Sequence, residues 1–348
     1  MRWASLALVG LVCACAASTP QAGRPSASPV AAVSPSPSPS APPTVIPFSP
    51  PGFKCRLPIT LFGGDVRSGA FIDFPSGAVT PAPASDTVNP IIHPGRELID
   101  QSYALYFDFA FSHWLPMHRN AVSPDGTHYA YTDRPVSPSQ DTPARASLHV
   151  VEVRTGIDRP FDGGDWGDPF VVLDYSSTGI YLTDTHGLGV WLLDPDGGAL
   201  TRPFFWSNVQ GHAGNVFWVG VTNPDDPHPV TATASNQLEA VNAVDGSLVV
   251  WFYRPSTSVH FITQDASGHP IIVLSTAELN SEELLYLPSP GVSREILHPG
   301  NGLPAISDPL ADQHGVWFGS PQGIYLYTMR DGLRQVSRHG GLPANGCL

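Results

Sequence analysis

Apolar and polar residues alternate in short runs along most of the chain, and turn-forming residues separate the runs. From residue 118 to residue 340 the pattern repeats as a short strand, a turn, an apolar strand, a loop, a second apolar strand, a Gly-containing turn and a polar-alternating strand. The best-defined unit covers Asn120–Phe161, and four more follow it. Short alternating runs bounded by Gly, Pro, Asp and Asn predict β-strands. This part of the chain is therefore expected to be all-β.

A glycine in the turn before the last strand of each unit measures the length of the repeat. The spacings between successive glycines are 41, 49, 45 and 41 residues, and the glycines are Gly156, Gly197, Gly246, Gly291 and Gly332. Each is expected to supply the positive φ of a tight hairpin. Four short strands at a period of ~40–50 residues predict the blade of a β-propeller, because a small twisted sheet can bury its faces only against neighbouring blades.

The two ends of the folded region predict how the ring closes. Residues 53–117 contain three strand-like stretches, LPITLFGG, GAFIDFPSG and ALYFDFAFSHWLP, which we interpret as one more blade with an insertion. The expected total is six four-stranded blades, with five or seven as open alternatives. The sequence GLPA occurs at 302–305, where the last unit begins, and again at 341–344. The final residues are therefore predicted to start a blade that the N-terminal strands complete.

The N-terminus has the pattern of an export signal, which we assign to residues 1–15. Arg2 precedes an apolar run that is too short to span a bilayer, and small residues follow it. Leu11-Val12-Cys13-Ala14-Cys15 resembles the lipobox of bacterial lipoproteins, and the resemblance implies that the mature chain begins at a lipidated Cys15. Cleavage after Ala16 by an ordinary signal peptidase is the alternative.

A tether is predicted over residues 16–52, which hold 11 Pro and 8 Ser. Such a segment cannot bury apolar area and favours polyproline II. We expect it to be a disordered stalk that precedes a propeller domain at 53–348.

Two of the four cysteines, Cys55 and Cys347, remain in the folded region once the signal is removed. Export implies an oxidising environment in which two thiols normally pair. The expected disulfide requires the two ends of the domain to meet, as ring closure does. Two unpaired buried thiols are the alternative.

The composition and net charge of the chain limit the kinds of partner it can bind. Of 348 residues, 38 are Pro, 33 are Gly and only 14% are charged, which excludes a long helical protein, while 10% aromatics exclude a wholly disordered one. Residues 53–348 carry 15 basic and 30 acidic residues, a net charge of −15. A domain this acidic is repelled by nucleic acid and by anionic membranes. No nucleic-acid partner is expected, and membrane contact is expected only through a lipidated N-terminus.

Two repeats resemble known propeller families. The unit AVSPDGTHYAYTD at 121–133 resembles the repeats of TolB-type propellers, and EAVNAVDGSLVVWF at 239–252 resembles one repeat of a quinoprotein-like propeller. Both resemblances imply a propeller fold, and neither implies a catalytic residue.

Catalytic motifs are absent from the sequence: there is no GxSxG, HExxH, Walker loop or GxGxxG after a strand. No catalytic or metal-ligating residue is therefore predicted. The Gly-rich loop that holds Asp162, Asp165 and Asp168 places three carboxylates at i, i+3 and i+6. Such loops can give oxygen ligands to Ca²⁺, although the alternative is a solvated connection. No other cofactor is expected.

Loop lengths predict a binding face. The loops between second and third strands are long at 134–146 and 223–235 and short at 184–189 and 319–323, whereas the turns before the first apolar strand stay short. Variable loops on a rigid scaffold are where binding usually resides. The candidate face comprises six residues: Asp162, Asp165, Trp166, Asp168, Trp206 and His212. Core packing is the alternative for the two tryptophans.

The sequence thus predicts an exported, lipid-anchored, monomeric propeller that acts as a binding or scaffold module for a protein or a small molecule. The alternative is a propeller hydrolase or lactonase with an axial site, which could depend on Ca²⁺.

Overall fold

The computed structural model describes residues 46–62, 68–83, 95–99, 105–136, 146–162, 170–184, 189–204, 206, 208–226, 235–275, 283–297 and 307–348. The chain divides into two units, Met1–Pro42 and Pro43–Leu348. The first unit, with the predicted signal peptide and Cys15, lies outside the described residues.

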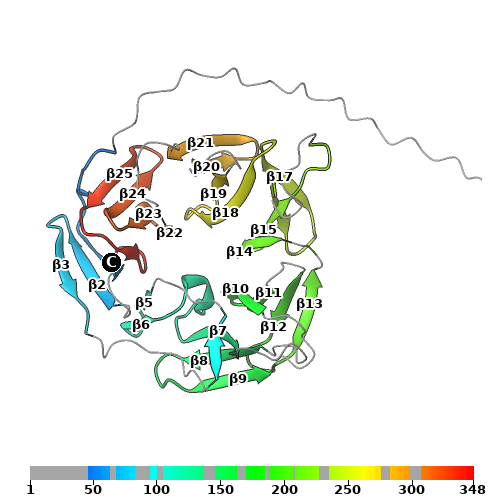
Figure 1. Ribbon diagram of the computed structural model, residues 1–348. Coiled ribbons are helices and arrows are strands. Elements are labelled where there is room, and N and C mark those ends of the chain that lie inside the picture. Colours follow the sequence, from blue (N-terminus) through cyan, green and yellow to red (C-terminus); the bar gives the residue numbers. More distant parts are fainter. Residues whose placement is uncertain are drawn as a thin grey trace, which may run out of the picture. The chain divides into compact units, whose positions relative to one another are not determined.

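Six four-stranded antiparallel sheets form a ring in the second unit (Figure 1). Strand order in each sheet runs from the centre of the ring to its rim, as in a β-propeller. The predicted all-β class and the six blades are confirmed. The described helical structure is one 3-10 turn at Arg119–Ala121, and no described helix is long and apolar enough to cross a membrane.

Blades 1 to 3 contain the following strands, in order from centre to rim. Blade 1 comprises β26 (Leu342–Pro343), β1 (Cys55–Leu61), β2 (Ser68–Phe74) and β3 (Ala78–Pro81). Blade 2 comprises β4 (Arg96–Leu98), β7 (His128–Pro135), β8 (Ser147–Glu152) and β9 (Asp158–Asp162). Blade 3 comprises β10 (Phe170–Ser176), β11 (Gly179–Asp184), β12 (Val190–Leu193) and β13 (Leu200–Phe204).

Blades 4 to 6 follow the same order. Blade 4 comprises β14 (Val209–Ala213), β15 (Val216–Val221), β16 (Gln237–Asn242) and β17 (Leu248–Tyr253). Blade 5 comprises β18 (Ser258–Gln264), β19 (Pro270–Ser275), β20 (Glu283–Ser289) and β21 (Val292–Leu297). Blade 6 comprises β22 (Ser307–Asp312), β23 (Gly315–Ser320), β24 (Gly323–Thr328) and β25 (Gly332–Ser337).

Blade 1 closes the ring with strands from both ends of the chain. In the register of β26 against β1, Pro343 lies opposite Ile59, so the second GLPA segment does provide the innermost strand. Cys55 and Cys347 form a disulfide with their Cα atoms 5.5 Å apart. Both parts of the closure predicted from the sequence are therefore confirmed.

The stretch ALYFDFAFSHWLP is not part of a blade, which corrects the prediction. It folds into a separate hairpin of β5 (Tyr106–Asp108) and β6 (His113–Leu115). Trp114 is fully buried and, with Phe71 of β2 and Phe107, packs in one apolar cluster. The hairpin thus packs against blade 1 (Figure 1). Its aromatic residues alternate with other residues, as apolar residues do in a blade strand, because they also face an apolar core.

The inner position of blade 2 is shared by two segments. β4 pairs with the end of β7, and a single antiparallel bridge joins Val122 to Tyr129 at its start. The short strand expected before the SPDG turn is represented by this bridge, and another segment fills most of the inner position. β4 comes instead from residues 80–100, a Pro-rich stretch without a strand pattern.

Apolar side chains gather between adjacent blades. One core cluster joins blade 2 to blade 3, for example Tyr129 and Ile180, and a second joins blade 6 to blade 1, for example Trp317 and Leu57. Three further clusters lie between blades 3 and 4, 4 and 5, and 5 and 6. Because full burial of a large apolar side chain stabilises by roughly 1.5–3 kcal/mol, each blade depends on its neighbours.

The turn glycines behave as predicted in four of the five units, since Gly156, Gly246, Gly291 and Gly332 have φ between 69° and 74°. In blade 3 the residue with positive φ is Gly198 at 73°, one place after the predicted Gly197. That turn reads Asp-Gly-Gly, so the sequence offered two candidates for one conformation.

The N-terminal side of the propeller begins before the predicted boundary at residue 53. Phe48 forms a parallel bridge with Gln335 on the rim strand β25, and the Gln335 amide donates to the Pro47 carbonyl at 3.0 Å. The guanidinium of Arg338 lies 4.4 Å from the Phe48 ring centroid. This segment covers an outer strand edge that would otherwise be open.

Candidate functional site

The predicted binding face is described only in part. Asp165, Trp166 and Asp168 lie outside the described residues, and of Asp162, at the end of β9, only the backbone is described. Most residues of the long loops between second and third strands also lie outside them. The elaborated face, and calcium at its acidic loop, therefore remain predictions.

His212 links two innermost strands. Its Nδ1 lies 2.7 Å from Oδ2 of Asp174, so β14 of blade 4 is joined to β10 of blade 3. The buried imidazole packs 4.3 Å from the ring of Tyr181 and 4.5 Å from that of Phe217. Trp206 packs at the edge of the same apolar cluster. The structure thus brings Trp206 and His212 to one apolar core between blades 3 and 4.

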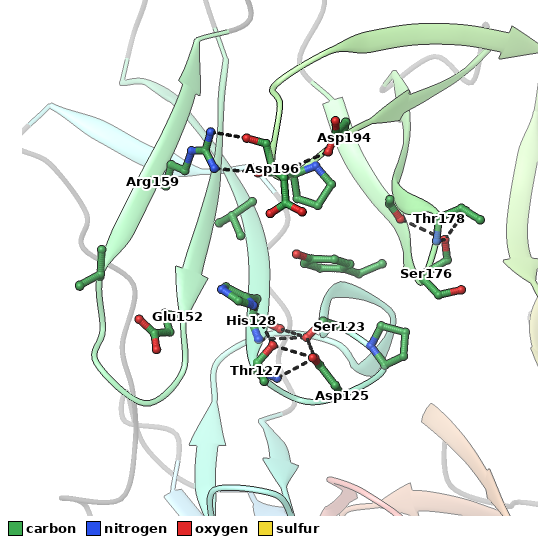
Figure 2. Close-up of a pocket in the computed structure, with 17 residues that line it drawn as sticks. Ser123, Asp125, Thr127, His128, Glu152, Arg159, Ser176, Thr178, Asp194 and Asp196 are labelled. Atoms are coloured by element: carbon green, nitrogen blue, oxygen red, sulfur yellow. Dashed lines mark hydrogen bonds between the residues drawn. The ribbon is translucent and has the colours of Figure 1, made fainter.

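A cleft opens between blades 2 and 3 on the opposite face, where first-to-second and third-to-fourth strand turns lie (Figure 2). Its volume is about 580 Å³. Four turns or turn ends build it, two from each blade. The lining comprises Ser123, Pro124, Asp125, Thr127, His128, Val150, Glu152, Ile157, Arg159, Tyr175, Ser176, Ser177, Thr178, Gly179, Asp194, Pro195 and Asp196.

Asp125 is fixed by the SPDG turn of blade 2. Its Oδ1 accepts hydrogen bonds from the Ser123 hydroxyl at 2.7 Å, the Thr127 hydroxyl at 2.7 Å and the Thr127 amide at 3.0 Å. These bonds favour the charged form and lower the pKa of Asp125 to about 2. Gly126 makes the turn possible, with a φ of 72°. The carboxylate is therefore ionised and held in place at neutral pH.

Asp194 and Asp196 come from the turn between β12 and β13. The Asp196 amide donates to Oδ1 of Asp194 at 2.9 Å. Backbone amides of Gly197 and Asp196, together with the charge on Arg159, lower the pKa of Asp194. Figure 2 shows Asp196 and Asp125 on facing sides of the opening.

Arg159 crosses from blade 2 to blade 3. Its guanidinium donates to the carbonyls of Pro195 at 3.0 Å and Asp196 at 2.7 Å and lies 4.9 Å from the ring centroid of Phe161. This side chain connects the two walls through backbone oxygens. Arg159 and the preceding Asp158 point to opposite faces of the sheet, because side chains alternate along a strand with a period of two residues. Asp158 faces the sheet interior.

Tyr175 is a buried aromatic side chain of the cleft. Burial raises the pKa of Tyr175 to about 12, and the charges of Asp125 and Asp196 add to the rise. The phenol is thus neutral at physiological pH. Val150 and Pro195 contribute further apolar surface to the lining.

The cleft is strongly acidic. Four carboxylates, Asp125, Glu152, Asp194 and Asp196, face one guanidinium, which gives a net charge of −3 with His128 neutral. Carboxylates beside an aromatic and aliphatic surface suit a cation with an apolar stem, such as a Lys or Arg side chain. Among the described residues, no group of three or more His, Cys, Asp or Glu side chains is arranged to hold a metal ion.

Reasoning from the sequence missed this cleft. The residues of the cleft lie in short turns, outside the long loops from which the binding face was predicted. They converge only when two blades pack side by side. One signal was present: the turns SPDG at 123–126 and DPDG at 194–197, in consecutive units, both contain Pro-Asp-Gly, although they occupy different positions in the repeat.

Among the comparisons with known proteins, only the one with solved structures finds matches. No family model matches the chain, and no curated protein matches it. A solved structure of a nidogen–laminin complex is 11% identical, with a TM-score of 0.40 over 83% of this chain and 96% of that chain. TolB from Acinetobacter baumannii is 12% identical, with a TM-score of 0.44 over 84% of this chain and 65% of TolB. A prolyl endopeptidase is 14% identical, with a TM-score of 0.44 over 78% of this chain and 38% of that chain. The chain is a six-bladed β-propeller by its own sheet topology. TolB and the nidogen–laminin complex are among the solved structures that it resembles.

Proposed function

We propose that this protein is an exported binding module whose propeller takes a Lys or Arg side chain of a partner protein into the cleft between blades 2 and 3. The observation that carries the proposal is the set of four carboxylates, from both blades, around one cleft with an apolar lining. The guanidinium of Arg159 is engaged with backbone carbonyls of the opposite wall. The net charge therefore favours a basic ligand.

The lining also favours an extended cation over a bare ion. An aliphatic stem can lie along Pro124 and Pro195 while its charged end meets Asp125 and Asp196, and an aromatic ring such as Tyr175 attracts a guanidinium. A segment of protein presents such a side chain at small entropic cost when its backbone is already ordered.

A calorimetric titration tests the proposal. The probes are three capped tripeptides, Gly-Arg-Gly, Gly-Lys-Gly and Gly-Glu-Gly, with arginine amide as a free small cation. We expect the Arg or Lys peptide to bind, the Glu peptide not to bind, and Asp125→Asn combined with Asp196→Asn to weaken binding by about tenfold or more. Asparagine keeps the acceptor oxygen on which the Asp125 turn depends.

The matched control is Asp73→Asn combined with Asp331→Asn. Asp73 lies near the end of β2, next to the third-to-fourth strand turn of blade 1, and Asp331 lies in the corresponding turn of blade 6, so the control changes the net charge equally and away from the cleft. Equal weakening by the two double variants would mean non-specific charge attraction and would refute the proposal. Binding of arginine amide as tightly as the peptide would make the ligand a small cation.

We also propose that a lipid at Cys15 holds the protein to a membrane and that the Pro- and Ser-rich stalk lifts the propeller away from it. The lipobox-like sequence and the composition of residues 16–52 support this. Labelling with a radioactive fatty acid should mark the wild-type chain and not Cys15→Ala. Equal labelling of both would remove the anchor.

The alternative of a propeller hydrolase with an axial site has no observation among the described residues that favours it.

A further inference from the structure

The rim strand of blade 4 differs from every other rim strand of the propeller. Strands exposed at a sheet edge are normally blunted by charge or proline, because an open apolar edge pairs with other chains. The other five rim strands follow this rule with Pro81 in β3, Pro160 in β9, Pro203 in β13, Arg294 and Glu295 in β21, and Arg334 in β25. β17 reads Leu-Val-Val-Trp-Phe-Tyr, with neither charge nor proline.

The side chains of β17 also make an exposed apolar patch. Among the described residues twelve large apolar side chains are exposed, and five of these fall within ten residues of blade 4. Their exposed fractions are Val244 77%, Leu248 50%, Val249 47%, Val250 44% and Tyr253 39%. Such clustering marks an interaction surface, whereas single exposed apolar residues do not.

The backbone of this strand is open over Leu248–Val250. β17 is the last strand of its sheet and lies at the rim of the ring (Figure 1), and no described strand pairs with its outer edge. The Gly291 amide of blade 5 donates to the Trp251 carbonyl at 2.8 Å, so the neighbouring blade engages the strand at its fourth residue and the open part precedes that contact. In blade 6 the corresponding edge is covered by residues 47–49, which shows that rim strands of this propeller accept an added strand.

Charges at the two ends of β17 identify the occupant. Asp245 precedes the strand and Arg254 follows it, and residues 246–253 between them are uncharged. If a second β17 runs antiparallel about a two-fold axis near Val249, Asp245 of each copy comes close to Arg254 of the other. A pair of ion pairs then flanks an apolar centre. Arg254 is held at this edge by its ion pair with Glu283.

We propose that β17 is an interface between two copies of this chain, formed by antiparallel pairing of the two strands across a two-fold axis. Such an isologous contact uses the same patch on both copies and closes on itself. The contact is stabilised both by backbone hydrogen bonds at the open edge and by burial of Leu248, Val249 and Val250. The proposal replaces the monomer expected from the sequence, and it is independent of the cleft, which lies between other blades.

Sedimentation equilibrium of the purified full chain tests the proposal with two variants of opposite charge. Val249→Lys and Val249→Asp each place like charges face to face across the axis. We expect the wild type to sediment at twice the chain mass and each variant alone at the chain mass. An equimolar mixture of the two variants should return to twice the chain mass, because Lys then faces Asp.

The control is Val136→Lys, which introduces the same charge at a valine that is 49% exposed in blade 2. It should remain a dimer. A wild type that sediments at the chain mass would overturn the proposal, as would a dimer that survives both Val249 variants. Variants that are monomeric alone and stay monomeric when mixed would contradict pairing across a two-fold axis at Val249.

Discussion

Gly126 and Gly246 have the same backbone conformation in different surroundings. Their φ values are 72° and 71°, which favour glycine. A Cβ on Gly246 would meet nothing within 4 Å, whereas one on Gly126 would lie 2.5 Å from Oδ1 of the buried Asp108. Asp108 is itself fixed because it accepts hydrogen bonds from two backbone amides in the β5–β6 turn.

Substitution of the two glycines separates conformational cost from crowding. We expect Gly246→Ala to lower the free energy of unfolding by about 1 kcal/mol through backbone strain alone. Gly126→Ala should cost about 1–3 kcal/mol more, because Asp108 must move. Urea unfolding measures both. Equal losses would show that the SPDG turn does not rest on Asp108.

The depressed pKa of Asp125 gives a pH dependence of known sign. The folded-state pKa of about 2 lies below the ordinary value, so the charged form is favoured in the folded protein. The stability it contributes is present above the ordinary pKa near 4 and is lost as the pH falls through about 2. The melting temperatures of the wild type and Asp125→Asn should therefore differ at pH 5 and converge toward pH 2. A constant difference would contradict the assignment.

At the scale of elements, β9 is anchored by a buried polar group beneath the cleft. Asp158 accepts a hydrogen bond from the Tyr131 hydroxyl at 2.8 Å and pairs with Nδ1 of His149 at 3.0 Å. Nε2 of His149 lies 3.3 Å from Asp133, which is fully buried. This network ties β9 to β7 and β8 and so fixes where Arg159, the next residue, enters the cleft.

Removal of Asp158 should cost more than removal of an exposed acid. Asp158→Ala takes a hydrogen-bond acceptor from two buried side chains, and we expect a loss of about 1–3 kcal/mol in the free energy of unfolding. Asp331→Ala, in an exposed turn of blade 6, should change it by about 0.5 kcal/mol or less. Guanidinium chloride unfolding compares the two. Similar losses would mean that the network contributes nothing beyond surface charge.

The strands that repeat were predictable, and those that break the repeat were not. The turn glycines identified the blades because a positive φ recurs before the last strand of the five units from 118 to 340, and the second GLPA segment identified the closing strand. The hairpin at 106–115 was wrongly predicted to form blade strands. Alternation of apolar and polar residues indicates that one face of a strand is buried, but it does not indicate which sheet the strand joins. β4 was missed because three residues in a Pro-rich stretch carry no pattern of their own.

The cleft was missed for a different physical reason. Asp125 and Asp196 are 71 residues apart in the sequence and meet across two blades. Convergence of this kind depends on how blades pack, which no linear spacing encodes. His212 was selected because of its position near a connection between blades, and its bond to Asp174 gives it a place in the interface between blades 3 and 4.

At the scale of the whole molecule, the disulfide closes a ring that is otherwise held by the two residues of β26 and the contacts around them. The bonded cysteines are 292 residues apart in sequence. In the loop-entropy model, so long a link stabilises by roughly 5 kcal/mol. Cys55→Ser combined with Cys347→Ser should therefore unfold at a markedly lower urea concentration.

Mass spectrometry of an unreduced digest should first show the Cys55–Cys347 peptide pair in the wild type. Two free thiols there, or an unchanged unfolding midpoint in the double variant, would contradict covalent closure of the ring.

We propose that the cleft between blades 2 and 3 binds a basic side chain, and a crystal structure of the complex with the capped Gly-Arg-Gly peptide would locate that side chain. We expect the guanidinium of the peptide in this cleft, within hydrogen-bond distance of Asp125 or Asp196. A peptide bound in the central channel or on the opposite face, with the cleft empty, would contradict it.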